Sequence, residues 1–128
     1  KTGFSFSNVV PGGAAVPAGG NTVYLRNNGS ANLSLKMSIS STPSNLNNTD
    51  LTKVFVEISR SDTNFNQTYS LKSLIDSYAG GGTVLNDVVN SGTTAQYQLR
   101  VSMSADAFNS TNGATISGVD IAFVGLAV

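Results

Sequence analysis

The chain has 128 residues, with seven basic and seven acidic side chains, so its formal net charge is zero and only 11% of its residues are charged. This balance argues against nucleic-acid binding, which needs a clustered basic surface, and against a polybasic contact with a membrane surface. The absence of histidine and cysteine leaves no ligands for the usual zinc, iron–sulfur or haem sites and no Ser/His/Asp or Cys/His nucleophile pair.

The first half of the chain predicts β-strands separated by polar turns. Residues 3–10 alternate phenylalanine with serine, and a Pro-Gly-Gly sequence at 11–13 ends this strand. Residues 22–40 predict a hairpin in which two alternating strands flank the Asn-Asn-Gly-Ser turn at 27–30, because asparagine and glycine supply the positive φ angles of tight turns. A further alternating strand is expected at 53–60.

The second half of the chain contains the single predicted helix. Apolar residues recur at i, i+3, i+4 and i+7 within 70–79, and the glycines at 80–82 are expected to end this helix. Residues 83–85 predict a short edge strand and 94–104 a long alternating strand. The last predicted strand, 115–127, is apolar on almost both faces.

These elements predict one all-β domain covering residues 1–128. Short alternating strands with frequent turns and one small helix, at about 70–79, are typical of an antiparallel β-sandwich, here jelly-roll-like. The longest apolar run, at 118–128, contains Asp120 and is too short to cross a bilayer as a helix. We therefore expect no membrane insertion of this segment.

The acidic residues do not predict a catalytic or metal site. None lies within two residues of another, so neither a D-x-D motif nor a calcium-binding loop is present. A carboxylate pair for glycoside hydrolysis could still assemble in space, but Asp62, Asp87 and Asp106 fit solvated loop positions better, and Glu57 falls on the solvent face of its strand. We expect no catalytic residues, no cofactor and no metal, and a protein that is not an enzyme.

A glycan-binding module is the alternative that the composition leaves open. Such modules usually stack sugars on exposed tryptophan or tyrosine side chains. This chain has no tryptophan, and its four tyrosines fall on positions compatible with a core.

The two terminal strands suggest self-association. Strand 3–10 carries large aromatic side chains on one face, and strand 115–127 is apolar on both. An exposed edge strand this apolar would aggregate, so it is either a central strand or is covered by a neighbouring subunit through β-augmentation, two interpretations that are compatible. The zero net charge favours association of copies.

Several motifs in a fixed order resemble the camelysin/TasA family of secreted biofilm-matrix fibre proteins. They begin with Phe-Ser-Asn-Val-Val-Pro-Gly at 6–12 and Val-Tyr-Leu-Arg-Asn-Asn-Gly-Ser at 23–30. A short helical segment at 69–76, a Gly-Thr-x-x-x-Tyr strand at 92–97 and a final amphipathic strand after a polar loop at 109–113 follow. The resemblance covers essentially the whole chain.

The resemblance implies an exported jelly-roll subunit, cleaved from a signal peptide upstream of this chain, that polymerises into extracellular filaments. In such fibres an N-terminal segment of one subunit completes a sheet of the next, so the partners are other copies of the chain, with a matrix polysaccharide as a further candidate. Family members usually carry another strand before the Pro-Gly turn, which here follows only about ten residues. The donor is therefore either residues 1–9 or a segment outside this chain.

The positions that match these roles are the apolar residues of the terminal strands. As donor residues we expect Phe4, Phe6 and Val9, and as acceptor residues Ile121, Phe123 and Val124. Camelysins have been described as metalloproteases, but a chain without histidine has no H-E-x-x-H ligand set for that activity. The alternative function is a surface-displayed adhesin or glycan-binding β-sandwich module.

Overall fold

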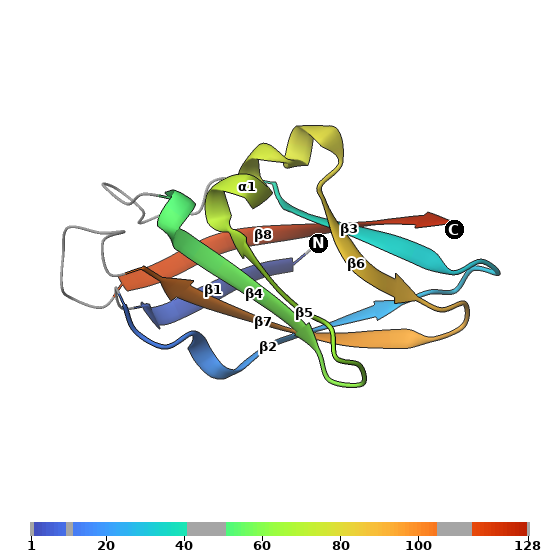
Figure 1. The fold of residues 1–128 in the computed structure, drawn as a ribbon, viewed down its shortest axis with the longest axis horizontal. Helices are drawn as coiled ribbons and strands as arrows, with labels where there is room; N and C mark the ends of the chain where they lie inside the picture. Colours follow the sequence, from blue (N-terminus) through green and yellow to red (C-terminus); the bar gives the residue numbers. More distant parts are fainter. Residues whose placement is uncertain (1, 10–11, 41–50, 105–113, 128) are drawn as a thin grey trace.

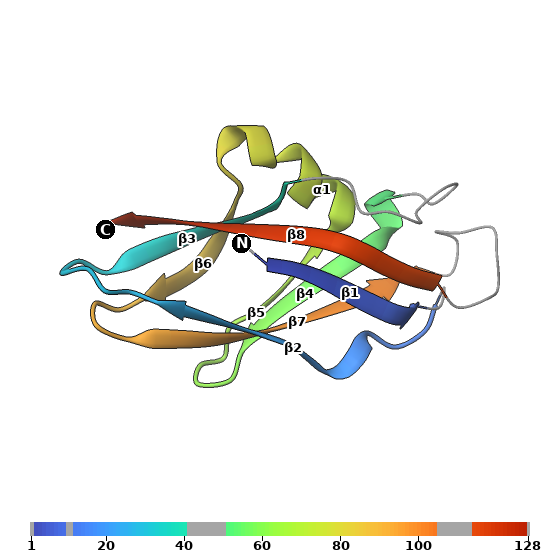
Figure 2. The same ribbon diagram turned by 180° about the vertical axis from the view of Figure 1, so that it is seen from behind.

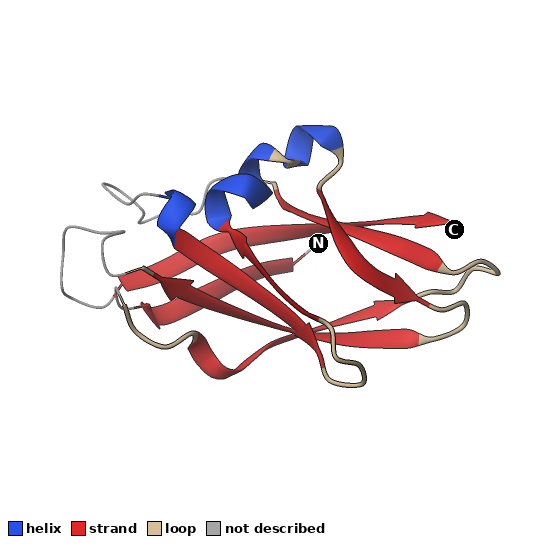
Figure 3. Ribbon diagram, viewed as in Figure 1, coloured by secondary structure: helices blue, strands red, loops and turns tan. Residues whose placement is uncertain are grey.

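A computed structural model describes residues 2–9, 12–40, 51–104 and 114–127 (Figure 1). In these ranges the chain forms two antiparallel four-stranded sheets, drawn as red arrows in Figure 3. Asp106, one of the acids considered above, lies outside the described residues. The strands are β1 (Thr2–Val9), β2 (Val16–Arg26), β3 (Leu33–Ile39), β4 (Val54–Arg60), β5 (Asn66–Ser70), β6 (Thr83–Val89), β7 (Thr94–Met103) and β8 (Ala114–Ala127).

The order of the strands is that of a jelly roll. One sheet has the order β1-β8-β3-β6 and the other the order β2-β7-β4-β5. Successive strands therefore mostly cross from one sheet to the other, and the first and last strands lie side by side (Figure 1). The predicted all-β antiparallel sandwich is confirmed, and this order matches the double-sheet jelly roll.

The core lies between the sheets and follows the alternation seen in the sequence. Successive side chains of a strand point to opposite faces, and in β7 every second residue from Ala95 to Met103 is buried. The same holds for β4 from Val54 to Ile58. The residues of β3 that face inward, Leu35, Met37 and Ile39, close the core from the other sheet.

The predicted helix is present and shorter than expected. Helix α1 (Leu71–Asp76) begins after Ser70, whose hydroxyl accepts a hydrogen bond from the Ser73 backbone N–H at 3.1 Å. A 3₁₀ turn, η2 (Tyr78–Gly80), follows, and Gly81 ends it with a φ of 94°, as expected for a glycine cap. A second 3₁₀ turn, η1 (Leu51–Lys53), precedes β4.

The hairpin predicted at 22–40 is wrong. Its two strands belong to different sheets, because β2 pairs with β7 while β3 pairs with β6 and β8. The Asn-Asn-Gly-Ser segment is instead a corner between the sheets, so the apolar faces of β2 and β3 meet across the core. Two strands are also longer than predicted: β6 extends to Val89, and β2 begins at Val16 with a register shift before Asn21.

Asn27 fixes this corner. Its buried amide Nδ2 donates to the carbonyl oxygens of Ala31 at 2.8 Å and Val89 at 2.9 Å. Its Oδ1 accepts from the Gly29 N–H at 3.0 Å. Its backbone N–H donates to the Thr93 carbonyl at 2.9 Å. The Asn27 side chain therefore joins the corner to β6 of the neighbouring sheet, and its backbone N–H joins the corner to the turn before β7.

Replacing Asn27 with alanine should lower the free energy of unfolding by about 2 kcal/mol, because the buried carbonyl of Val89 loses its donor. Urea denaturation of the two proteins measures this difference. Asn28→Ala is the matched control, since Asn28 is exposed and its Oδ1 accepts a hydrogen bond from the exposed Arg26 Nε; its effect should stay within about 0.5 kcal/mol. Equal effects of the two substitutions would contradict this role of Asn27.

Candidate functional site

The predicted donor and acceptor strands lie side by side within one chain. Strand β1 pairs with β8 in antiparallel orientation, with Thr2 opposite Ile121 (Figure 2). The predicted donor residues are therefore on the strand next to the predicted acceptors, but they do not lie opposite them. Phe4, Phe6 and Val9 lie opposite Val119, Ile116 and Ala114.

The three predicted acceptor residues are divided between the two faces of β8. Ile121 is part of the core, with 1% of its surface exposed. Phe123 points the same way, is half-buried and stacks on Tyr97, with ring centroids 6.3 Å apart. Val124 points outward and is 40% exposed. They lie within four residues of one strand but do not form a single surface.

Strand β8 is longer than the strand that covers its edge. Described pairing with β1 begins at Thr2, opposite Ile121, whereas β8 continues to Ala127. Its other edge is paired with β3 as far as Ala127. Among the described residues, no strand pairs with the β1 side of residues 122–127 (Figure 2). We call residues 122–127 the free half-edge.

The hydrogen-bonding groups of the free half-edge can be assigned from the register. The Ser40 N–H donates to the Asp120 carbonyl oxygen at 3.0 Å, and the pairing of β3 with β8 continues without a shift to Ala127. Residues of an antiparallel strand alternate between its two neighbours. The N–H and C=O groups of Ala122, Val124 and Leu126 therefore face β3, and those of Phe123, Gly125 and Ala127 face the free side.

The core is incompletely covered near the free half-edge. Val23 lies opposite Tyr97 in the β2–β7 pair, and Phe123 stacks on the same tyrosine ring from the other sheet. Both are only half-buried, as is Leu25 two residues further along β2. A strand placed beside residues 122–127 would bring side chains over this region and remove its apolar surface from water.

The outer face of the same sheet is unusually apolar. The described part of the chain has six exposed large hydrophobic side chains, and four of them lie on this face. Lys36 of β3 lies between Val84 of β6 and Val124 of β8, and Ser34 lies between Val88 and Leu126. The four exposed apolar side chains therefore form two pairs, one on β6 and one on β8, separated by polar residues of β3.

Two of the exposed large side chains are tyrosines. The tyrosines were expected at core positions, but Tyr24 of β2 is 66% exposed, and Tyr78 of η2 is also exposed. Tyr24 lies on the outer face of the β2-β7-β4-β5 sheet, opposite Gln96 of β7.

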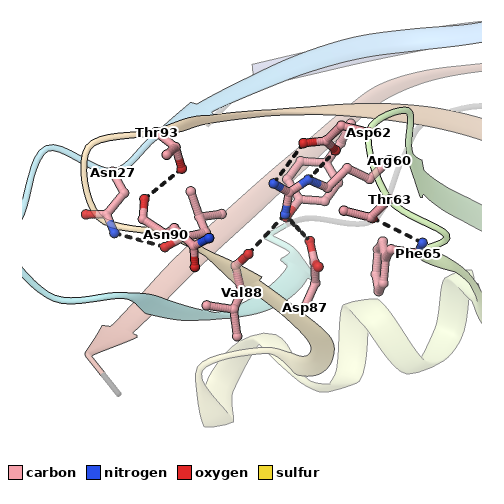
Figure 4. A network of polar contacts seen from close by, with 11 residues as sticks. Asn27, Arg60, Asp62, Thr63, Phe65, Asp87, Val88, Asn90 and Thr93 are labelled. Carbon is pink, nitrogen blue, oxygen red and sulfur yellow. Dashed lines mark hydrogen bonds and ion pairs between the residues drawn. The ribbon is translucent and has the colours of Figure 1, made fainter.

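A polar network on the opposite side of the sandwich links the two sheets (Figure 4). Arg60, at the end of β4, donates from Nε to Asp62 at 2.6 Å. Its Nη1 reaches β6 in the other sheet, donating to Asp87 and to the Val88 carbonyl, both at 3.0 Å. The Arg60 side chain is only 9% exposed, so this network closes the β6 side of the sandwich.

Tyr97 completes this network. Its hydroxyl donates to Asp87 Oδ2 at 2.5 Å, and the Arg60 guanidinium lies 5.8 Å from the centre of its ring. Burial and the bond to Asp87 raise the pKa of Tyr97 above its ordinary value of 10.0. Burial alone would lower the pKa of Arg60, but its hydrogen bonds to Asp62 and Asp87 raise it. Each charged side chain in the network has a partner, as buried charges require in a folded protein.

The prediction that Asp87 is a solvated loop acid is therefore wrong, whereas Asp62 does lie in the exposed turn after β4. Asp87 is part of β6, and its side chain is 11% exposed. It lies two residues from both Leu85 and Val89, which are buried, so its side chain points to the same inward face of the strand. A carboxylate at an inward position of an alternating strand was the signal for a buried ion pair. The hydrogen bond from Arg60 holds the pKa of Asp62 below its ordinary value.

Glu57 lies on the outer face of its sheet, as predicted, and forms an ion pair with Arg100 on the neighbouring strand β7. Within the described ranges, no group of three or more acidic side chains is arranged to hold a metal ion.

Comparisons with models of protein families, with curated proteins and with solved structures find no match to this chain. The resemblance to the camelysin/TasA family stays a prediction. In the described residues, no helix has the length and apolar character needed to cross a membrane.

The raised pKa of Tyr97 predicts a loss of stability in alkali. Above pH 10 the unfolded chain releases this proton while the folded chain retains it, so the contribution of Tyr97 is complete below pH 10 and falls as the pH rises. At pH 11 the loss from this residue should be about 1.4 kcal/mol. Urea denaturation at pH 8 and pH 11 measures it.

Tyr97→Phe should be less stable than the parent protein at pH 8 but should lose less stability between pH 8 and pH 11. The matched control is Tyr24→Phe, at an exposed position, which should keep the full alkaline loss. An equal alkaline loss in all three proteins would contradict the buried, hydrogen-bonded state of Tyr97.

Proposed function

We propose that this protein is a structural subunit of an extracellular filament, a biofilm-matrix fibre or a pilus-like polymer, whose copies join by strand addition at β8. The observation that supports this most directly is that the predicted donor strand β1 is the edge strand of its sheet and pairs there with the predicted acceptor strand β8. The resemblance of the sequence motifs to secreted fibre proteins points to the same function and to a location outside the cell.

Strand addition suits the chemistry of this edge. The free backbone groups of Phe123, Gly125 and Ala127 offer donors and acceptors that an extended segment can satisfy. The same segment would cover the half-buried Val23 and Leu25 of the opposite sheet. A formal net charge of zero puts little repulsion between approaching copies.

The donor in this proposal is the N-terminal segment, residues 1–9. Because β1 already pairs with β8 of its own chain, donation means that β1 leaves this position and pairs with the β8 of a neighbour. The bonds broken and formed are of the same kind, so the exchange resembles a domain swap. If each copy donates in one direction and accepts in the other, the contact does not close, and a filament grows.

The acceptor strand is longer than the donor, with 14 residues in β8 against eight in β1. A donated strand that also covers residues 122–127 must shift its register along β8 relative to that of β1 within one chain. Phe4, Phe6 and Val9, which lie opposite Val119, Ile116 and Ala114 within one chain, would then lie closer to the Phe123 end of the neighbour's β8. Within this acceptor, Phe123 faces inward and Val124 faces outward.

Negative-stain electron microscopy across a range of protein concentrations tests the proposal. We expect filaments above a threshold concentration, with single particles below it. A protein that stays monomeric at high concentration, also with any natural upstream residues present, would rule out the filament function.

Deletion of residues 1–9 identifies the donor. The shortened chain should remain folded, with some loss of stability because β8 loses a neighbour, and should form no filaments. A Ser5→Ala, Ser7→Ala variant keeps the backbone and both phenylalanines of this strand and should still polymerise. Filaments formed by the shortened chain would show that residues 1–9 are not the donor.

The alternative function is a surface adhesin or glycan-binding module, and one observation favours it. Tyr24 is 66% exposed on a polar sheet face, beside Gln96 and near the Thr22–Gln98 hydrogen bond. An exposed aromatic ring with adjacent amides can stack on and hydrogen-bond a sugar. Binding of matrix polysaccharide that Tyr24→Ala abolishes, in a protein that forms no filaments, would favour this alternative.

A further inference from the structure

The outer face of the β2-β7-β4-β5 sheet carries one arginine that has no acidic partner among the described residues. The acidic side chains described in this sheet and in the turn after β4, Glu57 and Asp62, are each ion-paired with a different arginine. Arg26, the last residue of β2, is exposed and hydrogen-bonds only to neutral side chains. It therefore leaves a positive charge on this face that no carboxylate of the described chain balances.

The Arg26 guanidinium is held in position without being neutralised. Its Nε donates to Asn28 Oδ1 at 3.0 Å, and its Nη1 donates to Thr94 Oγ1 at 3.3 Å on the neighbouring strand β7. A guanidinium has five N–H donors in a rigid plane, so three remain for a ligand. Hydrogen bonds between a guanidinium and an anionic oxygen are roughly twice as strong as neutral ones. An anionic group is therefore the ligand that Arg26 favours.

The single charge at this position matches a carboxylate. A phosphate monoester carries a charge of about −2 at neutral pH, and the proteins that bind one usually surround it with several donors and cations. Here one guanidinium faces solvent beside neutral hydroxyl and amide groups. A carboxylate, with one negative charge, balances it.

An exposed aromatic ring lies beside this charge. Tyr24 and Arg26 are two residues apart on β2, so their side chains leave the same face of the sheet from Cα atoms about 7 Å apart. Tyr24 is 66% exposed. A flat, exposed ring can stack on the apolar face of a sugar. One ligand that has both a sugar ring and a carboxylate can therefore contact both side chains.

Two glutamines of β7 add hydrogen-bonding groups. Gln96 lies opposite Tyr24, and its amide has no hydrogen-bond partner within the described part of the chain. Gln98 lies opposite Thr22 and accepts from its hydroxyl at 2.9 Å through Oε1, which leaves the two N–H donors of its amide for a ligand. These amides can bind the hydroxyl groups of a sugar.

We propose that the surface formed by Tyr24, Arg26, Gln96 and Gln98 binds an acidic polysaccharide that contains uronate residues. Tyr24 stacks on a sugar ring, Arg26 binds its carboxylate, and the glutamines bind its hydroxyl groups. The inference rests on the sugar-binding alternative above for the role of Tyr24, and it adds the acidic class of the sugar. It does not depend on filament formation, because β1 and β8 belong to the other sheet.

The position of this surface suits a polymer. Strand β2 is at the edge of its sheet, beside β7 (Figure 2), so a polysaccharide can lie across the face and continue past the edge. A contact of this size holds one sugar unit weakly. Many copies along one polysaccharide chain would bind it more tightly, because successive contacts become intramolecular.

Titration calorimetry of the dilute full chain with an oligogalacturonate tests the class of ligand. The comparison ligand is the same oligomer with its carboxyl groups reduced to alcohols. The oligogalacturonate should bind at least about tenfold more tightly than the reduced oligomer, because the reduced oligomer cannot form the charged hydrogen bonds to Arg26. Equal binding of the two oligomers, or no binding of either up to about 10 mM, would overturn the proposal.

Substitution of Arg26 locates the charge. Arg26→Gln should weaken the binding of the oligogalacturonate about tenfold and leave that of the reduced oligomer unchanged. Lys72→Gln is the matched control, because it removes the same charge from an exposed side chain on helix α1, and it should change neither. An equal loss in the two variants would show an effect of net charge alone and would overturn the site.

Substitution of Tyr24 tests the stacking contact. Tyr24→Ala should weaken the binding of the oligogalacturonate at least about tenfold, whereas Tyr24→Phe, which keeps the ring, should stay within about threefold of the parent protein. Circular dichroism checks that each variant is folded. Unchanged binding in Tyr24→Ala would overturn the proposed surface. The Tyr24 and Arg26 variants should form filaments as the parent protein does, so electron microscopy of the same samples separates a failure of this site from a failure of the filament.

Discussion

The structure depends on the unequal coverage of the two edges of β8. On one side β3 pairs with it from Ile121 to Ala127, and on the other side β1 begins only at Thr2, opposite Ile121. A strand in the middle of a sheet normally satisfies its backbone groups on both sides. Among the described residues, the backbone groups of residues 122–127 are paired on the β3 side, and the proposed strand addition takes place along the other edge of β8.

The two long sides of the sandwich are closed by different physical means. On the β6 side, Arg60 donates to Asp87 and the Val88 carbonyl, and Tyr97 donates to the same carboxylate. These charged bonds also protect the β6 edge from pairing with another strand. On the β1 side the contacts are backbone pairing and apolar packing, which a second copy can reproduce. The β6 side is therefore held by charged hydrogen bonds within the chain, and the β1 side by contacts that another copy can also make.

Much of the fold could be predicted from the sequence, because alternation along β4 and β7 and the helical spacing from Leu71 onward are local patterns. The relation between β2 and β3 could not, since turn residues show a change of direction and not which strands pair. The free half-edge depends on the relative lengths and register of β1 and β8, including two register shifts. The Arg60–Asp87 contact joins residues 27 apart, and only the inward parity of Asp87 indicated it.

Residue-resolved amide hydrogen exchange of the full chain tests the central claim, that residues 122–127 have a free edge that association covers. In dilute protein, the amides of Phe123, Gly125 and Ala127 should exchange rapidly, while those of Val124 and Leu126, which face β3, are protected. On concentration into filaments, the first three amides should become protected. Protection of these amides already at dilution, or their rapid exchange in the associated protein, would contradict the account.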